Sequence, residues 1–412
     1  MNLFSQYRGF RRELYILFWG RVVTNMGALI WPMLTLILTN KLGFSPSHAS
    51  TLILVVGVFM LPATLIGGRL ADRMDKRKLI CCCDLITVAG YLACGLLPMT
   101  WFSVVCFSVA GIFAQLEWPS FDALVANLSS PEERERAYSF NNLGSNLGLV
   151  LAPTLGGLLF ENHLDLAFII SGVATLSSTI LIFFFVRDTR RSRGEKASGI
   201  YEEEKDISVK EVFSGNPVLV FFMVCIGLGM AMHTVSLNFL MPLSMDHFFG
   251  TKGALLLGTL TSINAVAVLI GTPLFTSVLS GIRDVTKLQI GVLLQMLGYG
   301  FFAFAGDNLV YYFLSIIVFT CGQVLMSLGD QPYISRRVPA SHRGRMSAIR
   351  STGQMTLQGA LLLGAGQVAD FLSMSRIWLG MVIVGFLNFL VIFWLRRMDK
   401  KQFSLFYSKK NK

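Results

Sequence analysis

Hydrophobic residues run along this chain in blocks of about 20, and short polar connections separate most of the blocks. A helix of that length crosses about 30 Å of hydrocarbon. The alternating ten-residue pattern of a membrane β-barrel strand is absent from the sequence. The pattern therefore predicts an all-α membrane protein with about twelve spans. They are expected near residues 14–38, 50–71, 79–98, 101–125, 138–160, 166–186, 217–243, 253–279, 286–305, 309–334, 345–368 and 375–395.

One polar connection is longer than the others and carries mixed charge, "RDTRRSRGEKASGIYEEEKDISVKE". It lies between the sixth and seventh predicted spans and is poor in aromatic residues. We interpret it as a cytoplasmic linker over residues 188–216. It divides the chain into a six-helix bundle over residues 1–187 and a second six-helix bundle over residues 217–412, which ends in a basic tail.

Composition supports the membrane assignment, because 53% of the residues are hydrophobic and only 14% are charged. Soluble domains average roughly 25% charged residues. Roughly thirty of the 35 Lys and Arg residues fall on the side of the predicted termini and linker, and only Lys41, Lys252 and Arg376 fall on the opposite side. This asymmetry predicts that both termini are cytoplasmic. The net charge of +11 then reflects topology and attraction to anionic lipids rather than nucleic-acid binding.

The two predicted bundles share an internal repeat with a shift of about 210 residues. Pro32 aligns with Pro242, "DKRKL" with "DVTKL", and "EWP", which begins at Glu117, with "DQP", which begins at Asp330. Each match is weak alone, but they occur in order. Repeated halves are typical of secondary transporters, whose binding site lies near the midplane between the repeats.

A charged motif follows the second predicted span, "GGRLADRMDKRKLI" over residues 67–80. Small residues let membrane helices approach closely, and a carboxylate such as Asp72 suits a helix N-terminus. The motif predicts a latch that is broken and remade between transport states; a static basic anchor is the alternative. Its candidate residues are Gly68, Asp72, Arg73, Lys76 and Arg77.

This motif resembles the loop 2–3 signature of the major facilitator superfamily, with Asp75 in place of the usual glycine. "GSNLGLVLAPTLGGLL" in the fifth predicted span is similar to the antiporter motif of that superfamily, at Gly148, Pro153, Gly156 and Gly157; Ala152 stands where a glycine is common. For these four residues, a hinge and tight static packing are both open. The resemblance implies two six-helix bundles around a cavity lined by spans 1, 4, 7 and 10, and it favours the bacterial twelve-helix drug–proton antiporter branch.

Ionisable residues inside the predicted spans are candidates for proton coupling, because a charge in hydrocarbon costs at least about 2.5–3.5 kcal/mol. Arg21 and Glu117 lie at similar depths of about 10 Å and about 12 Å, at 1.5 Å per residue. We expect them to pair, or Glu117 and Asp122 to compete for Arg21; a static salt bridge is the alternative. Asp330 has either a cavity role or a helix-end interaction with Arg336 or Arg337. His233 suits a proton relay or an interhelical hydrogen bond.

Polar and aromatic side chains inside the spans are candidates for contact with a small-molecule substrate, although polar contacts between helices are the ordinary role of the amides. The candidates are Asn25, Trp31, Trp118, Asn238, Asn264, Gln295, Gln323 and Gln354. No phosphate-binding loop, metal-ligand cluster or nucleophile–base pattern occurs in the sequence. We therefore expect no enzyme activity, no cofactor and no metal.

The predicted function is proton-coupled efflux of small amphipathic or drug-like compounds by alternating access. The alternative is a carrier for one metabolite, sugar or lipid, working by uptake or uniport. A sensor or scaffold has little support, because no signalling domain is attached. We expect a monomer in the plasma membrane, the cytoplasmic membrane of a bacterium, whose partners are substrate, protons and lipids.

Overall fold

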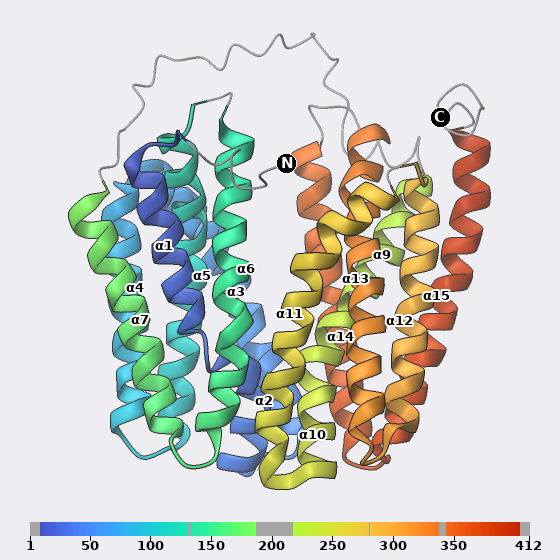
Figure 1. Cartoon of the computed structure of the whole chain (residues 1–412), viewed down its shortest axis with the longest axis horizontal. Coiled ribbons are helices and arrows are strands. Elements are labelled where there is room, and N and C mark those ends of the chain that lie inside the picture. The colour runs from blue at the N-terminus through green and yellow to red at the C-terminus, as the bar shows by residue number, and fades with distance from the viewer. Residues whose placement is uncertain (1–8, 131–132, 187–216, 280, 338–342, 404–412) are drawn as a thin grey trace. The chain divides into compact units, whose positions relative to one another are not determined.

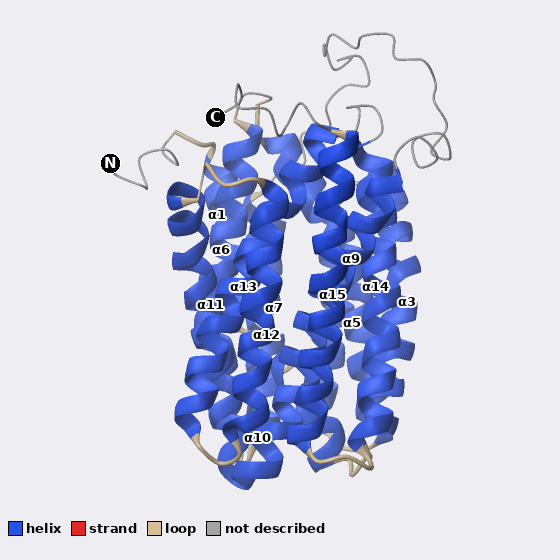
Figure 2. Cartoon of the chain, turned by 90° about the vertical axis from the view of Figure 1, so that its right-hand side faces the viewer, coloured by secondary structure: helices blue, strands red, loops and turns tan. Residues whose placement is uncertain are grey.

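The computed structural model of this chain describes residues 9–130, 133–186, 217–279, 281–337 and 343–403. Within these ranges every regular element is a helix (Figure 2). The predicted linker over residues 188–216 lies outside the described residues. The all-α class predicted from the hydrophobic pattern is confirmed.

The helices of the first half of the chain are drawn in blue to green in Figure 1. Three of its elements are short: η2 is a 3-10 turn, α2 is a single α-turn and η3 is a π-helical turn. The bounds are α1 Arg12–Met26, η2 Trp31–Met33, α2 Leu34–Leu36, η3 Ile37–Lys41, α3 Pro46–Arg73, α4 Lys76–Leu96, α5 Trp101–Leu128, α6 Arg134–Phe160 and α7 Leu164–Phe185.

The second half, drawn from yellow-green to red in Figure 1, also contains a π-helical turn, η4, and a 3-10 turn, η5. The bounds are α9 Pro217–Val235, η4 Ser236–Leu240, α10 Met241–Phe249, η5 Gly250–Lys252, α11 Gly253–Val278, α12 Asp284–Ala305, α13 Leu309–Arg337, α14 Arg343–Ala369 and α15 Met374–Gln402.

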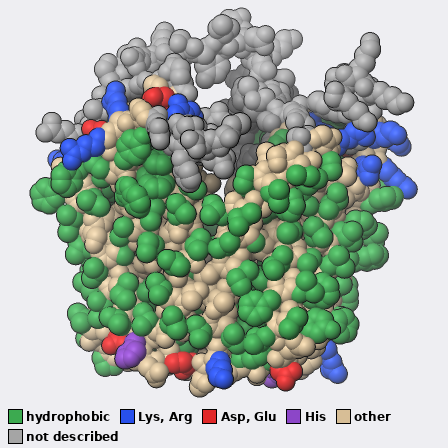
Figure 3. All heavy atoms as spheres, viewed as in Figure 1, with side chains coloured by type: hydrophobic (Ala, Val, Ile, Leu, Met, Phe, Trp, Pro, Cys, Tyr) green, Lys and Arg blue, Asp and Glu red, His purple; other side chains and the backbone are tan. Residues whose placement is uncertain are grey.

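Ten segments of the described residues are long and apolar enough to cross a membrane. One of them, Val218–Val278, runs for 61 residues and contains both the seventh and the eighth predicted spans. The eleventh predicted span corresponds to α14, whose polar residues keep it out of the ten. When the long segment is divided and α14 is added, the predicted twelve helices are all present. On the face shown in Figure 3, hydrophobic side chains cover the middle of the helices and charged ones lie at their ends.

The first predicted span is not the continuous helix expected over residues 14–38, because α1 ends at Met26 and short turns follow. Pro32 lies in η2, directly after this break. Its repeat partner Pro242 follows the π-turn η4, where the backbone N–H of Met241 donates to the carbonyl of Ser236. A proline has no N–H for the usual helical bond, so irregular turns at both positions follow from the sequence.

The chain forms two compact units. Unit 1 comprises Met1–Ser45, Thr51–Ser198 and Met245–Ala265, and unit 2 comprises Pro46–Ser50, Gly199–Ser244 and Val266–Lys412. Each unit therefore includes a short segment from the other half of the sequence. The predicted bundle boundary within residues 188–216 stays a prediction.

Close backbone contacts at two glycines join helices within each of the two units. In unit 1, a Cβ added to Gly258 of α11 would overlap the carbonyl oxygen of Pro153 on α6. In unit 2, a Cβ added to Gly366 of α14 would overlap the hydroxyl of Ser50. Small residues allow this approach of helix backbones, which stabilises membrane bundles through van der Waals contact.

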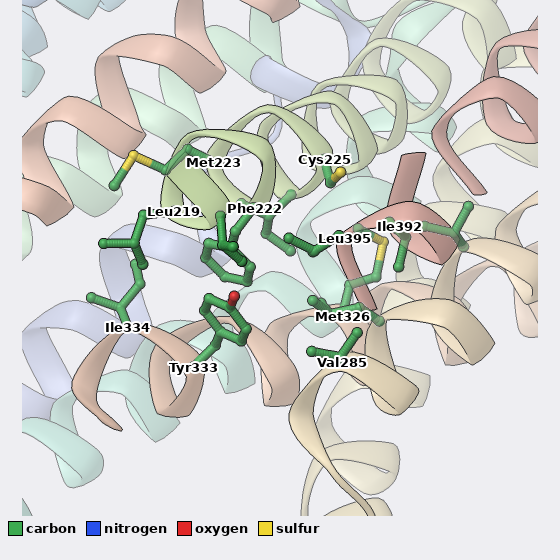
Figure 4. Packing of buried hydrophobic residues seen from close by; sticks show 14 of the residues in the cluster. Leu219, Phe222, Met223, Cys225, Val285, Met326, Tyr333, Ile334, Ile392 and Leu395 are labelled. Atoms are coloured by element: carbon green, nitrogen blue, oxygen red, sulfur yellow. The ribbon is translucent and has the colours of Figure 1, made fainter. Parts of the chain in front are cut away.

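Within unit 1, α4 packs between α5 and α7, and α1 packs between α6 and α7. Its buried cluster includes Phe18 and Phe140, whose rings stack with centroids 4.0 Å apart. Within unit 2, α12 packs between α13 and α15, and α9 packs between α14 and α15. Figure 4 shows its core, where the rings of Phe222 and Tyr333 stack with centroids 3.9 Å apart.

Candidate functional site

Arg21 lies inside unit 1 on α1 and is only 6% exposed. Its guanidinium carbon is 3.8 Å from the ring centroid of Phe121 and 4.5 Å from that of Trp118, both on α5. Nε and Nη2 of Arg21 are buried and have no hydrogen-bond acceptor among the described residues. A buried cation is therefore held by aromatic faces, whose negative quadrupole attracts it, and keeps part of its hydrogen-bonding capacity unused.

Glu117 lies on the same part of α5 and is 8% exposed. Phe121 follows it by four residues, so both side chains project from one face of the helix. Arg21 therefore covers the turn of α5 that carries Glu117. The predicted ion pair between Arg21 and Glu117 is nevertheless not formed, since no ion pair or hydrogen bond joins these two described residues.

Two further carboxylates belong to this neighbourhood, Asp84 on α4 and Asp122 on α5. Arg21 is an electrostatic neighbour of both, and of Glu117. Thr179 of α7 donates a 2.7 Å hydrogen bond to Oδ2 of Asp84. We call Arg21, Asp84, Glu117 and Asp122 the N-unit charge cluster. It gathers three acids in the electrostatic neighbourhood of one arginine. The competition of Glu117 and Asp122 for Arg21 stays a prediction.

The candidate substrate residues of unit 1 lie on four elements: Asn25 on α1, Trp31 on η2, Trp118 on α5 and Asn264 on α11. Trp118 is 46% exposed, and Trp31 packs its ring 4.8 Å from that of Phe107. Asn25 lies on α1 against Gly148 of α6, whose added Cβ would come within 2.6 Å of the Asn25 Cβ. Asn264 of α11, also in unit 1, is buried.

The matching acid of unit 2, Asp330, forms an ion pair that the sequence did not predict. Arg350 of α14 donates from Nη1 to Oδ2 of Asp330 at 2.7 Å. Oδ1 of Asp330 and Nε of Arg350 are buried without a partner among the described residues. The helix-end interaction expected with Arg337 is not made, and the side chain of Arg336 lies outside the described residues.

Arg337 instead joins three helices of unit 2. Its Nε and Nη2 each donate to Asp399 of α15 at 2.8 Å, and its Nη1 is 3.8 Å from Oδ2 of Asp284 on α12. The hydroxyl of Tyr333 donates to the same Asp399 at 2.9 Å. Sequence reasoning missed this network, although Asp399 offered a signal as a single acid within the basic run "RRMDKK".

The remaining candidates of unit 2 include several buried polar groups without a partner. His233 of α9 stacks on Phe319 of α13 with centroids 4.5 Å apart, and its Nδ1 has no partner among the described residues. The same holds for Nε2 of Gln295 and Oε1 of Gln323. Asn238 is exposed in η4, and Gln354 is half-buried in α14. Thus α9, α12 and α13 hold unused hydrogen-bonding groups inside unit 2.

The charged motif over residues 67–80 covers the last turns of α3 and the start of α4, and its close helix approach lies one residue earlier than expected. A Cβ added to Gly67 would overlap the carbonyl oxygen of Leu116 on α5, whereas one added to Gly68 meets no described atom within 4 Å. Arg73 is exposed and Lys76 is half-buried. The side chain of Asp72 lies outside the described residues.

Two residues of this motif form hydrogen bonds at helix ends. Asp75 accepts a 2.9 Å hydrogen bond from the backbone N–H of Lys78 and caps the start of α4. Arg77 donates to the carbonyls of Phe183 and Val186 at 3.2 and 3.3 Å, at the end of α7. The last carbonyls of a helix lack partners within it and favour a cation. Arg77 therefore joins the start of α4 to the end of α7 within unit 1.

The glycines of the fifth-span motif make tight packing contacts. On α6, a Cβ at Gly148 or Gly156 would crowd the carbonyls of Val22 and Leu29, and one at Gly157 would overlap that of Ala254 on α11. The hydroxyls of Thr154 and Ser262 are 2.8 Å apart beside Pro153. Of the two alternatives left open by the sequence, this geometry fits tight packing; the hinge role of Pro153 stays a prediction.

Among the described residues, no group of three or more His, Cys, Asp and Glu side chains could hold a metal ion. The chemistry available in the N-unit charge cluster is the binding and release of protons or cations by carboxylates, modulated by one guanidinium.

The fold and these buried charges define the class: the chain is a multi-pass helical membrane protein of the transporter type. The sequence profile of the Major Facilitator Superfamily matches residues 17–363. The chain therefore belongs to the Major Facilitator Superfamily, as the two motifs predicted.

Curated relatives are distant. The chain is 21% identical to the Na(+), Li(+), K(+)/H(+) antiporter of Planococcus maritimus over 351 residues, which cover 78% of this chain and 81% of the antiporter. It is 25% identical to the quinolone resistance protein NorA of Staphylococcus aureus over 226 residues, about half of each protein (53% and 56%).

Solved structures share the fold at still lower identity. A crystal structure of the peptide transporter POT in complex with sulfate matches with a TM-score of 0.78 and 15% identity, covering 96% of each chain. A crystal structure of the nucleoside transporter NupG matches with a TM-score of 0.72 and 11% identity, covering 93% of this chain and 99% of that one. At these identities the likeness establishes the major facilitator fold.

Proposed function

We propose that this protein exports small amphipathic or cationic compounds in exchange for protons. The observation that carries the proposal is the N-unit charge cluster, in which Glu117 is buried beside an arginine that makes no ion pair with it. The antiporter and drug-resistance relatives support the same assignment. Trp118 and Phe121, already stacked on the guanidinium of Arg21, supply aromatic faces of the kind that bind organic cations.

The coupling follows from the cost of burying charge. A carboxylate in hydrocarbon is stabilised either by a proton or by an approaching cation. While Arg21 rests on the aromatic rings, Glu117 takes up a proton; when Arg21 or a cationic substrate moves onto Glu117, the proton leaves. A small movement of α1 against α5 thus links proton release to the position of substrate. Asp84 and Asp122 tune the exchange by competing for Arg21, while Asp330 and His233 are secondary candidates for proton binding in unit 2.

The test is transport by purified protein in proteoliposomes that carry an internal pH indicator. Addition of an amphipathic cation should move protons in the wild type, and Glu117→Gln should abolish this movement while leaving substrate binding measurable. Asp165→Asn is the matched control, because Asp165 lies in the first turn of α7, at an end of the helix. Undiminished proton movement in Glu117→Gln would refute the coupling role.

A second candidate is exchange of monovalent metal ions for protons, which the antiporter relative favours. The same liposomes distinguish the two, since an ion exchanger responds to Na⁺, Li⁺ or K⁺ without any organic cation. A carrier for one metabolite, sugar or lipid would respond to a single chemical series instead of to several unrelated compounds.

The proposal includes a location and an orientation. The bacterial relatives and the basic residues at one end of the helices support a bacterial cytoplasmic membrane with both termini inside. We also expect a functional monomer. Labelling of single cysteines introduced at Lys252 and Lys401 with an impermeant maleimide tests the orientation: only the cysteine at position 252 should react in intact cells.

A further inference from the structure

A pocket of about 290 Å³ lies in unit 2 where α12 begins and α15 approaches its end. Its lining residues are Arg283, Phe393, Arg396, Arg397 and Lys400. Four of the five are basic and none is acidic. Its volume lies just below the roughly 300–1,000 Å³ typical of small-molecule sites. The pocket is therefore sized for a compact anionic group.

The two carboxylates adjacent in sequence to the pocket residues form ion pairs with Arg337, which does not line the pocket. Asp284 follows Arg283 and Asp399 precedes Lys400, yet both are buried and face Arg337. Among the described residues, no carboxylate forms an ion pair with Arg396, Arg397 or Lys400. Arg396 donates instead to the amide oxygen of Gln289 at 3.0 Å. Arg396, Arg397 and Lys400 thus keep their positive charge at the pocket.

Backbone electrostatics favour an anion at the same place. Arg283 is the N-cap residue of α12, so the positive end of that helix dipole lies at the pocket. Guanidinium groups bind phosphate oxygens well, because their planar donors match phosphate geometry. These features together select a phosphate group.

An exposed apolar stripe runs along α15 to the pocket. It favours a phospholipid over a soluble phosphate, because acyl chains can lie along it. Its residues recur every three or four positions and are each at least 44% exposed: Ile383, Phe386, Leu387, Leu390, Phe393 and Trp394. Phe393 also lines the pocket, where the guanidinium of Arg397 lies 4.7 Å from its ring. Figure 3 shows this arrangement in outline, with Lys and Arg side chains above a hydrophobic surface at the end of α15.

We propose that this pocket binds the phosphate headgroup of an anionic phospholipid whose acyl chains lie along the stripe. The lipid bridges α12 and α15 at the Lys- and Arg-rich end of unit 2. Clusters of basic residues beside a membrane helix attract anionic lipids, at about 1 kcal/mol per charge, and each such charge corresponds to roughly a fivefold change in affinity. The site is separate from the N-unit charge cluster and does not depend on the proposed function.

Native mass spectrometry of the full-length protein in detergent tests this site. Phosphatidylglycerol should bind more tightly than phosphatidylcholine with the same acyl chains. Removing two pocket charges, Arg397→Ala with Lys400→Ala, should weaken phosphatidylglycerol binding roughly thirtyfold, at roughly fivefold per charge. The single variant Arg397→Lys keeps the charge and should retain most of the wild-type affinity for phosphatidylglycerol.

Lys401→Ala is the matched control, since Lys401 is exposed in the same helical turn but does not line the pocket. Equal loss of binding in this control, or equal affinity for the two lipids, would overturn the proposal. Inorganic phosphate is the third ligand. If it bound the wild type as tightly as phosphatidylglycerol does, the site would belong to a soluble anion and the lipid assignment would be wrong.

Discussion

Arg350 of α14 donates a 2.7 Å hydrogen bond to Asp330 of α13, and both side chains are at least 88% buried. The repeat aligns Asp330 with Glu117, but Glu117 has no such ion pair with Arg21. Two acids at equivalent positions of the repeat therefore differ in their environment. One is already stabilised by a charged hydrogen bond, whereas the other has no ion pair among the described residues.

Breaking the Asp330–Arg350 pair should mainly lower stability. Arg350→Ala leaves a buried carboxylate alone, which typically costs about 3–5 kcal/mol. Thermal unfolding in detergent measures the loss, and the double variant Arg350→Ala/Asp330→Asn should recover part of it. Asp330→Asn alone should retain proton-coupled exchange in liposomes. If Asp330→Asn abolished exchange as Glu117→Gln is expected to do, Asp330 would carry the coupling as well.

Replacing Arg21 with lysine should separate charge from aromatic stacking. Lysine keeps the positive charge but loses the planar group that lies against Phe121 and Trp118. Such contacts are worth up to about 2 kcal/mol when desolvated, so the turnover rate should change by roughly tenfold or more. Proteoliposome flux measures this. An unchanged rate in Arg21→Lys, alongside a strong loss in Arg21→Gln, would show that charge alone matters.

The two adjacent glycines near the end of α3, Gly67 and Gly68, form a matched pair for a packing test. Gly67→Ala places a methyl group on the Leu116 carbonyl of α5, while Gly68→Ala finds open space among the described residues. Overpacking typically costs about 1–3 kcal/mol. We expect Gly67→Ala to lower the unfolding temperature and Gly68→Ala to leave it nearly unchanged. Equal destabilisation by both changes would contradict the contact with α5.

Asp399 should be the most sensitive acid for the stability of unit 2. Asp399→Ala removes the acceptor of both Arg337 and Tyr333 and leaves a buried guanidinium beside Asp284. A loss of about 3–5 kcal/mol is expected from urea or thermal unfolding. Asp307→Ala serves as the control, because Asp307 is exposed in the connection after α12. A loss no larger than the control's would mean that this network does not stabilise the unit.

Much of this architecture follows from the sequence alone, because the hydropathy of a segment depends only on its own residues. Twenty apolar residues in a row cross a membrane as a helix whatever their neighbours are, so the number and order of the helices could be predicted. Pro32 lies in η2, after α1 has ended, and Pro242 follows η4. The missing N–H that favours an irregular turn at each proline is also a local property of the sequence. The loop and fifth-span motifs were enough to predict the superfamily.

Only the tertiary structure decided which polar groups meet. Arg21 and Glu117 lie at matching depths, yet the rotation of α1 sets the guanidinium on Phe121 instead of on the carboxylate. Arg337 binds Asp399, 62 residues away, because α13 and α15 flank α12 in the folded unit. The approach of α3 to α5 at Gly67 and not Gly68 is likewise a matter of helix rotation. A single residue turns a side chain by about 100° around a helix, and hydropathy averaged over a span contains no information about that angle.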